Sequence, residues 1–345
     1  MKSIISHSKP TLSSMDIDAV KRVLHSGMIA SGEQTAEFEN RVAEYLNLES
    51  GAATASGSSA LYLCLKALGV GKGDEVILPT YVCISVLNAV KQTGANPVLC
   101  DIDENWGICL DTVIPHISPK TKAIVAPYIG GIAFDIKSLV ELDIPVIEDL
   151  AQAFGVTING RKAGTYGQIT MCSFQAIKCL TSGGEGGMVL SNDKTLMSHI
   201  RSKKIYSPMS DLQAAVGISQ LEQYPSFLKR RKQIADQYFN TFDRFQNMCM
   251  PLQLRKKSIF FRFPLIISQP FEMIKQDFEN EGIAVRQFID FLLHKIIEQP
   301  KDIFPMAELH FRQTLSIPIY PSLHDSQVEY ITKTGEQIFR RYDNK

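Results

Sequence analysis

The sequence predicts an α/β fold with a mostly parallel sheet, followed by a smaller α+β unit. Between residues 51 and 192, short runs rich in Val and Ile alternate with helix-like stretches, and after about residue 245 this pattern changes. Short apolar runs that end in Pro, Asp or Gly are typical of strands buried on both faces. Because helices separate these runs, the strands fit a parallel sheet with crossover connections.

Six segments are expected to be strands of the large sheet, and two stretches between them are expected to be helices. The strand candidates are residues 75–79, 96–101, 123–128, 144–149, 169–174 and 187–191. The helix candidates, 58–69 and 85–94, have apolar residues at helical spacing and end in Gly, which commonly follows the last turn of a helix.

The C-terminal part begins with a long helical pattern over residues 211–245, which we expect to be interrupted or bent near Pro225. The smaller unit should combine strands and helices. Its strand candidates are residues 259–267 and 315–320, and its helix candidates are 271–282 and 326–342. No repeat or Pro/Gly/Ser-rich linker marks a boundary, so the two domains should meet within continuous structure.

The composition is that of an ordinary globular protein, and it narrows the possible partners. The 345 residues are 45% hydrophobic, which is enough for a large core shared between two domains. Lys plus Arg equals Asp plus Glu at 36 each, so no overall basic field attracts nucleic acid or an anionic membrane. We therefore expect small molecules as partners.

The cysteines and the apolar runs indicate a cytoplasmic protein. Seven scattered cysteines, none in a CxxC pair, suit reduced thiols better than disulfides or a metal site. No apolar run approaches the roughly 18 residues of a membrane span, and the N-terminus does not resemble a signal peptide.

Ligands of open parallel sheets bind beyond the carboxyl ends of the strands, so residues just after the apolar runs are candidates for the site. The segment Ser56-Gly57-Ser58-Ser59 opens one predicted helix. The free N–H groups and the positive end of a helix dipole can hold a phosphate there. An ordinary serine helix cap is the simpler interpretation of the same residues.

Two further strand ends carry chemistry. Glu148 and Asp149 end a buried strand, where a carboxylate can pair with a protonated ring nitrogen, although an Asp in that place is more often a turn residue. Lys178 follows the next strand among small residues, close to a glycine cluster at 183–187. Desolvation there would lower the pKa of the amine and make it a nucleophile.

The stretch from residue 144 to 193 resembles the signature region of the DegT/DnrJ/EryC1/StrS family, the nucleotide-sugar aminotransferases that depend on pyridoxal 5'-phosphate (PLP). Similar segments extend this resemblance over residues 29–46, 56–81, 118–130 and 209–238, and more weakly over 315–323. The resemblance implies fold type I of the PLP enzymes. A large domain, 1–237, would hold a seven-stranded, mostly parallel sheet between helices, and 238–345 would form the small α+β domain.

The resemblance also implies roles for single residues. Lys178 would carry PLP as a Schiff base, Asp149 would pair with the pyridine nitrogen, and Gln152 would lie near the ring hydroxyl. The phosphate group would be held by Gly57, Ser58 and Ser173, with Ser59 in the same turn. Two residues are candidates for contact with substrate. They are Glu185, in the glycine cluster, and Tyr320, in the segment 315–323 that resembles the family more weakly.

The implied reaction has two halves. An amino acid, commonly glutamate, converts PLP to pyridoxamine phosphate, whose nitrogen then passes to a keto group of a nucleotide-linked deoxysugar in cell-surface polysaccharide or glycoside biosynthesis. Lys178 would move the proton between substrate and cofactor. The resemblance implies a homodimer with active sites between the subunits.

Three features depart from the family pattern. Cys83 stands where relatives have an aromatic residue that stacks on the cofactor ring, so stacking is absent or falls to Tyr81. The segment 203–215 lacks the Asn and Arg of the family's loop before the long helix, and 126–131 lacks a histidine that many relatives have. These departures bear on the substrate and subunit side of the pocket more than on the cofactor.

Three other functions stay open. The 3-dehydratase branch of the family has histidine in place of the lysine, and Lys178 argues against it. Another PLP enzyme acting on amino acids alone should have an arginine that holds an α-carboxylate, and the sequence offers no clear candidate. The third alternative is a catalytically inactive cofactor-binding or regulatory protein.

Overall fold

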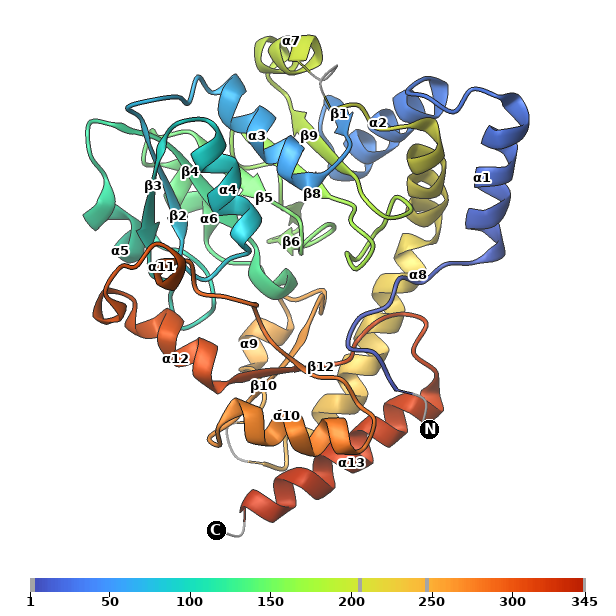
Figure 1. The fold of residues 1–345 in the computed structure, drawn as a ribbon, viewed down its shortest axis with the longest axis vertical. Helices are drawn as coiled ribbons and strands as arrows, with labels where there is room; N and C mark the ends of the chain where they lie inside the picture. Colours follow the sequence, from blue (N-terminus) through green and yellow to red (C-terminus); the bar gives the residue numbers. More distant parts are fainter. Residues whose placement is uncertain (1–3, 204–206, 246–247, 344–345) are drawn as a thin grey trace.

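The computed structural model describes residues 4–203, 207–245 and 248–343. A seven-stranded sheet forms the centre of a large unit, and a smaller unit with its own sheet lies beside it (Figure 1). In order across the large sheet, its strands are β1 (Ser50–Thr54), β9 (Gly187–Ser191), β8 (Ile169–Ser173), β5 (Val146–Asp149), β4 (Thr121–Pro127), β2 (Glu75–Pro79) and β3 (Asn96–Cys100).

The large sheet is mostly parallel, as the sequence predicts. The pairs β2/β3, β2/β4, β4/β5 and β5/β8 are parallel, whereas β9 runs antiparallel to both β8 and β1. All six strand candidates are present. The seventh strand, Ser50–Thr54, was not predicted from the apolar runs, because its residues SGAAT are too small to give a marked run.

Helices cover the large sheet and connect its strands. Helix α3 packs on β8 and β9, α4 packs on α3, and α2 packs on β1 and α8. The helices of the large unit are α1 (Ser14–Ser26), α2 (Glu33–Leu46), α3 (Gly57–Ala67), α4 (Ile84–Gln92), α5 (Leu110–Val113), α6 (Ile136–Val140) and α7 (Lys194–Lys203).

Helix α8 (Asp211–Phe242) links the two units and runs past both of them in Figure 1. Its start is fixed by a capping box, since Ser210 Oγ accepts from Gln213 N at 3.3 Å and Gln213 Oε1 accepts from Ser210 N at 3.0 Å. The helix continues through Pro225 instead of being interrupted there. The division between the two domains that we expect after residue 237 falls inside this helix and stays a prediction.

The small unit is built on a three-stranded antiparallel sheet in the order β10-β12-β11. Its strands are β10 (Phe263–Ile266), β11 (Arg286–Gln287) and β12 (Thr314–Ile317), and its helices are α9 (Leu252–Arg255), α10 (Phe271–Asn280), α11 (Leu293–Ile296), α12 (Pro305–Gln313) and α13 (Asp325–Asp343). The start of the chain joins this unit, because Ile5 pairs with Ile283 and His7 Nε2 lies 2.9 Å from Ser316 Oγ.

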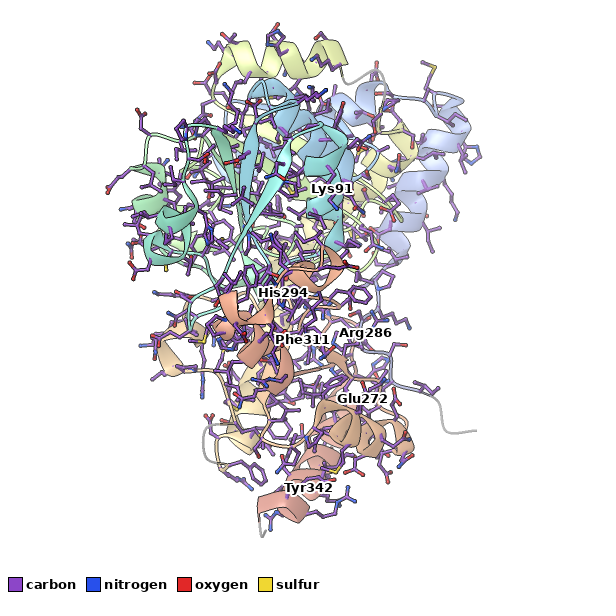
Figure 2. The ribbon with its side chains drawn as sticks, turned by 60° about the vertical axis from the view of Figure 1, so that its left-hand side comes forward. Lys91, Glu272, Arg286, His294, Phe311 and Tyr342 are labelled. Carbon is purple, nitrogen blue, oxygen red and sulfur yellow. The ribbon has the colours of Figure 1, made fainter. Side chains whose placement is uncertain are left out.

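A buried histidine connects the small unit to the end of β2. His294 Nδ1 lies 2.8 Å from Thr80 Oγ1, and His294 Nε2 lies 3.1 Å from a carboxylate oxygen of Glu308. Figure 2 shows His294 at the junction between the two units. This contact holds the small unit against the carboxyl ends of the large sheet, where the candidate site lies.

Candidate active site

A cavity of about 290 Å³ opens at the carboxyl ends of the parallel strands. Pro127 at the end of β4, Asp149 at the end of β5 and Ser173 at the end of β8 all line it. The volume is close to the lower end of ligand pockets, about 300–1,000 Å³. The cavity therefore lies where an open parallel sheet is expected to bind a ligand.

Strand β5 separates its two terminal carboxylates, because successive side chains of a strand point to opposite faces. Glu148 is fully buried and accepts hydrogen bonds from Tyr128 Oη and from the backbone amides of Gly164, Tyr166 and Gly167, at 2.5–2.7 Å. Glu148 is thus a structural residue that fixes the loop before β8.

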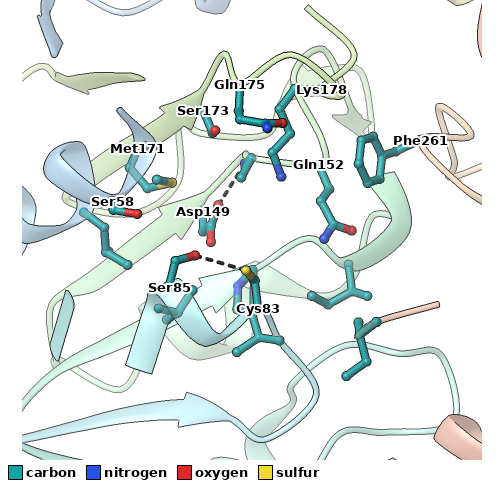
Figure 3. Close-up of a pocket in the computed structure, with 18 of the residues that line it drawn as sticks. Ser58, Cys83, Ser85, Asp149, Gln152, Met171, Ser173, Gln175, Lys178 and Phe261 are labelled. Carbon is teal, nitrogen blue, oxygen red and sulfur yellow. Dashed lines mark hydrogen bonds between the residues drawn. The ribbon is translucent and has the colours of Figure 1, made fainter. Parts of the chain in front are cut away.

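Asp149, on the other face, lines the cavity (Figure 3). Its Oδ1 accepts from Ala151 N at 2.8 Å. Burial raises the pKa of this carboxyl, while the Ala151 amide and the charge of Lys178 act to lower it. A buried carboxylate of this kind is best stabilised by a cationic partner in the cavity.

Lys178 reaches the same cavity from the loop after β8. The loop folds back on itself, since Phe174 N donates to Gly186 O and Ala176 N donates to Gly184 O, both at 2.8 Å. Burial lowers the pKa of the Lys178 amine, and the Asp149 carboxylate opposes that shift. Its Nζ has no hydrogen-bond acceptor among the described residues and lies 5.5 Å from the centroid of the Phe261 ring.

The first turn of α3 offers free amides to the cavity. Ser56 caps the helix, with its Oγ accepting from Ser59 N at 3.1 Å, and the amides of Gly57 and Ser58 donate to no acceptor within the described part of the chain. Both residues line the cavity together with Ser173. Two free amides at a helix start and an adjacent hydroxyl form an anion site.

Gln152 also lines the cavity, and its orientation is fixed by the backbone. Its Oε1 accepts from Gly130 N at 2.7 Å. The Nε2 group is therefore the end left to donate to a ligand. Gly130 belongs to the segment 126–131, in which we noted the missing histidine, and Pro127, Tyr128 and Ile129 of that segment line the same cavity.

Tyr81 and Cys83 lie in different surroundings although only Val82 separates them in the chain. Cys83 lines the cavity with an exposed thiol, whose Sγ accepts from Ser85 Oγ at 3.1 Å (Figure 3). Tyr81 is fully buried and does not line the cavity, so it does not supply a ring face there. Burial raises the pKa of the Tyr81 hydroxyl, and nearby Arg262 acts to lower it.

Of the remaining predicted residues, one lines the cavity and two do not. Glu185 is exposed and lines the cavity. Ser59 does not line it, because its amide and hydroxyl both bond to Ser56 Oγ. Tyr320 is buried in the small unit, near Tyr238 of α8, and is likewise not brought to the cavity. Residues 204–206, in the segment that lacks the family's Asn and Arg, lie outside the described residues.

Residues of the small unit complete the cavity, and the sequence reasoning missed them. They are Phe261, Arg262, Phe288, Ile289 and Asp290. A signal was present for one of them, because Arg262 is a charged residue inside the apolar run 259–267. Its position relative to the large sheet could not be read from that run.

These groups fit PLP. The cavity offers an amine with a lowered pKa for the aldehyde, a buried carboxylate for the ring nitrogen and free helix amides for the phosphate. Gly57 makes room for this arrangement, since a Cβ at that position would lie 2.7 Å from Ser173 Cβ.

Among the described residues, no three His, Cys, Asp or Glu side chains gather in a way that could hold a metal ion. Within the same part of the chain, no helix has the length and apolar character needed to cross a membrane.

Comparison with known proteins gives matches over nearly the whole chain. Residues 10–334 match the model of the DegT/DnrJ/EryC1/StrS aminotransferase family. GDP-perosamine synthase of Escherichia coli O157:H7 is 32% identical, over 96% of this chain and 97% of that protein. The dTDP-4-dehydro-2,3,6-trideoxy-D-glucose 4-aminotransferase of Saccharopolyspora spinosa is 29% identical, over 95% of each chain.

The same likeness is found among solved structures. The aminotransferase TlmJ of Streptoalloteichus hindustanus superimposes with a TM-score of 0.92 at 28% identity, covering 98% of this chain and 99% of the other.

Proposed function

The chain belongs to the DegT/DnrJ/EryC1/StrS aminotransferase family, and from that premise we propose that it transfers an amino group from an amino acid to a keto group of a nucleotide-linked deoxysugar. The protein is a PLP-dependent sugar aminotransferase. The observation that carries the proposal is the placement of Lys178 and Asp149 in one cavity beside the free amides of α3.

Six groups would hold the cofactor. The Lys178 amine would bond covalently to it, the Asp149 carboxylate would pair with the protonated ring nitrogen, and Gln152 Nε2 would donate to the ring hydroxyl oxygen. The amides of Gly57 and Ser58, with the hydroxyl of Ser173, would bind the phosphate. When bound, PLP withdraws electrons from the substrate carbon that bears nitrogen, which makes a proton on that carbon acidic.

The protein's own part in catalysis is to position groups and move a proton. Burial lowers the pKa of Lys178 and so favours the neutral amine, which can accept a proton from the substrate carbon. Asp149 keeps a negative charge opposite the ring nitrogen. Phe261 and Phe288 cover the cavity from the small unit and exclude water from the reacting atoms.

The substrates are proposed from the relatives. One is a GDP-perosamine synthase and another aminates a dTDP-linked keto-deoxysugar, so a nucleotide keto-sugar is the acceptor we propose, with glutamate as donor. Such products enter cell-surface polysaccharides or glycosides. A relative named for spore coat polysaccharide biosynthesis in Bacillus subtilis, 30% identical, supports the same context.

A homodimer in the cytoplasm is part of this proposal. Exposed apolar side chains gather on the N-terminal segment and α1, where a second subunit could cover them. They are Leu12, Met15, Ile17, Leu24, Met28 and Ile29. The seven free thiols suit a reducing compartment. Light scattering should give twice the mass of the chain, and a monomeric mass would contradict the dimer.

One experiment tests the function in steps. Purified protein should be yellow, and borohydride should fix the cofactor on the peptide that contains Lys178, whereas Lys178→Ala protein should show no fixed cofactor. Glutamate should bleach the colour, and a panel of keto-sugar nucleotides should then restore it and yield aminated sugars by mass spectrometry. If glutamate bleaches the protein but no keto-sugar nucleotide restores the colour, the acceptor assignment is wrong.

A further inference from the structure

Arg262 is a buried cation of the cavity, and the proposed cofactor contacts give it no role. It precedes β10, its side chain is 7% exposed, and it lines the same cavity as Lys178. Its Nη1 donates to Gln287 O at 2.6 Å, which holds the guanidinium in place. Among the described residues it has no other hydrogen-bond acceptor and no carboxylate within ion-pair distance. A guanidinium has five N–H donors, so most of them are free for a ligand.

The charged residues around Arg262 do not neutralise its guanidinium by an ion pair within the described part of the chain. Burial lowers the pKa of its guanidinium, while Asp290 raises it and Arg286 lowers it further. Asp290 lines the cavity but is itself exposed and too far away for an ion pair. A buried cation is unfavourable until an anion reaches it, so the cavity favours a ligand that brings negative charge to this place.

Arg262 and Lys178 approach the same aromatic ring. Lys178 Nζ lies 5.5 Å from the centroid of Phe261, and Arg262 Cζ lies 5.9 Å from it. The two cations therefore cannot be farther apart than the sum of these distances. Both cations line one cavity, so a small molecule that reacts at Lys178 can extend a charged group towards Arg262.

The chemistry of the two substrates indicates which one brings that group. Lys178 and Arg262 are the cationic side chains among the described residues that line the cavity, and Lys178 is occupied by the cofactor under the proposed function. An amino acid has a carboxylate next to its reacting nitrogen. The sugar ring of a nucleotide keto-sugar has hydroxyl groups near its ketone, and its charged diphosphate is attached at the anomeric carbon, away from the ketone. A planar guanidinium matches a carboxylate with two parallel hydrogen bonds.

We propose that Arg262 binds a carboxylate of the amino-acid donor and so selects amino acids in the first half-reaction. The inference rests on the proposed function and extends it to the donor subsite. It supplies the carboxylate-binding arginine for which the sequence alone offered no candidate.

The test uses the yellow holoenzyme and the variant Arg262→Gln, with Arg286→Gln as matched control. Arg286 is an exposed arginine of the same small sheet, labelled in Figure 2, and it does not line the cavity. In Arg262→Gln the glutamate concentration that half-bleaches the cofactor should rise about 10- to 100-fold, the range for a lost hydrogen-bonded charge pair. The control should stay within about twofold, since an exposed charge is well screened.

A second readout does not depend on turnover. Maleate, a dicarboxylate that cannot react, should bind the wild-type holoenzyme in calorimetry, and Arg262→Gln should weaken that binding by a similar factor. Arg262→Lys should recover part of it, because the charge is kept and the bidentate geometry is lost. If Arg262→Gln does not fold, as judged by circular dichroism and cofactor absorbance, Arg262→Lys alone carries the test through its weaker maleate binding.

Two results would overturn the inference. One is unchanged glutamate and maleate binding in a folded Arg262 variant. The other is a defect confined to the reaction with the keto-sugar nucleotide, which would assign the arginine to the acceptor. Neither the glutamate half-reaction nor the maleate measurement requires a sugar substrate. If no keto-sugar nucleotide restores the colour of the bleached cofactor, the proposed acceptor is wrong, but the glutamate and maleate measurements still test the role of Arg262.

Discussion

Gly57 faces Ser173 so closely that a Cβ on the glycine would lie 2.7 Å from the serine Cβ and 2.9 Å from its hydroxyl oxygen. The first turn of α3 can approach the end of β8 only because residue 57 has no side chain. This contact brings the free amides of Gly57 and Ser58 beside the Ser173 hydroxyl. The proposed phosphate site therefore depends on the absence of one methyl group.

Gly57→Ala should weaken cofactor retention and reduce stability. Overpacking of a tight contact costs about 1–3 kcal/mol, and the displaced helix start would lose its aim at the phosphate. The measurements are thermal unfolding and the rate at which the protein loses PLP absorbance on dilution. Gly71→Ala is the matched control, because a Cβ there meets nothing within 4 Å. Equal behaviour of the two variants would show that the contact is unimportant.

Asp149→Asn should lower cofactor affinity or rate by about two to four decades, since breaking a desolvated ion pair costs on the order of 3–5 kcal/mol. Asparagine keeps the size of the side chain but not its charge, so it should be nearly as damaging as alanine. PLP binding and the glutamate half-reaction measure this. A variant within fivefold of wild type would remove Asp149 from its proposed role.

Recombination of the apoprotein with PLP should depend on the protonation of Lys178. Only the neutral amine reacts, so the rate should rise with pH and level off below the ordinary lysine pKa of 10.5, because burial lowers the pKa of this amine. Asp149 raises that pKa and Arg262 lowers it. Asp149→Asn should therefore move the midpoint to lower pH and Arg262→Gln should move it to higher pH. Shifts in the reverse directions would contradict the proposed charge arrangement.

Cys83→Phe should tighten PLP retention without abolishing activity. The side chain at this position lines the cavity, where a ring could stack on the cofactor. Aromatic stacking contributes about 0.5–1.5 kcal/mol, so loss of PLP should become about two- to tenfold slower. Cys83→Ser should leave retention unchanged and serves as the control. Loss of all PLP binding in the Phe variant would show that residue 83 does not face the ring.

Asp211 should make stability depend on acid pH. Its carboxylate joins α8 to the start of α2, because it accepts from Gly32 N at 2.7 Å, Thr35 N at 2.9 Å and Thr35 Oγ1 at 2.7 Å. Burial acts to raise its pKa, but these hydrogen bonds bring the net pKa below the ordinary 3.8. The stabilisation is thus complete above about pH 4 and is lost as the pH falls through the lower, folded-state pKa.

Asp211→Asn should flatten this part of the acid unfolding curve and destabilise the protein at pH 7 by about 0.5–2 kcal/mol, as loss of a helix cap does. Denaturant unfolding between pH 2 and 7 measures both effects. Asp236→Asn, on the exposed face of α8, is the matched control. An unchanged slope below pH 4 in Asp211→Asn would contradict the low pKa.

Much of the cofactor side of the site could be predicted from the chain. Asp149, Ser173 and Lys178 each follow a recognisable strand, and parallel strands bring their carboxyl ends to one edge. Gly57 and Ser58 were identifiable because a small hydroxyl segment opens a helix. Ser59 belongs to the same segment, and Tyr81 and Tyr320 were predicted from the resemblance, but none of the three lines the cavity.

By itself, the sequence determined the α/β class, six of the seven strands of the large sheet and the residues at their ends, because apolar periodicity and strand termini are local properties. Only the tertiary structure decided that Glu148 is structural while Asp149 faces the cavity, and that Arg262 of the small unit lines the same cavity as Lys178. The orientation of a strand and the packing of one domain on another depend on contacts between residues far apart in the chain. No local pattern records those contacts, which is why the proposed donor side of the site could be identified only in the folded protein.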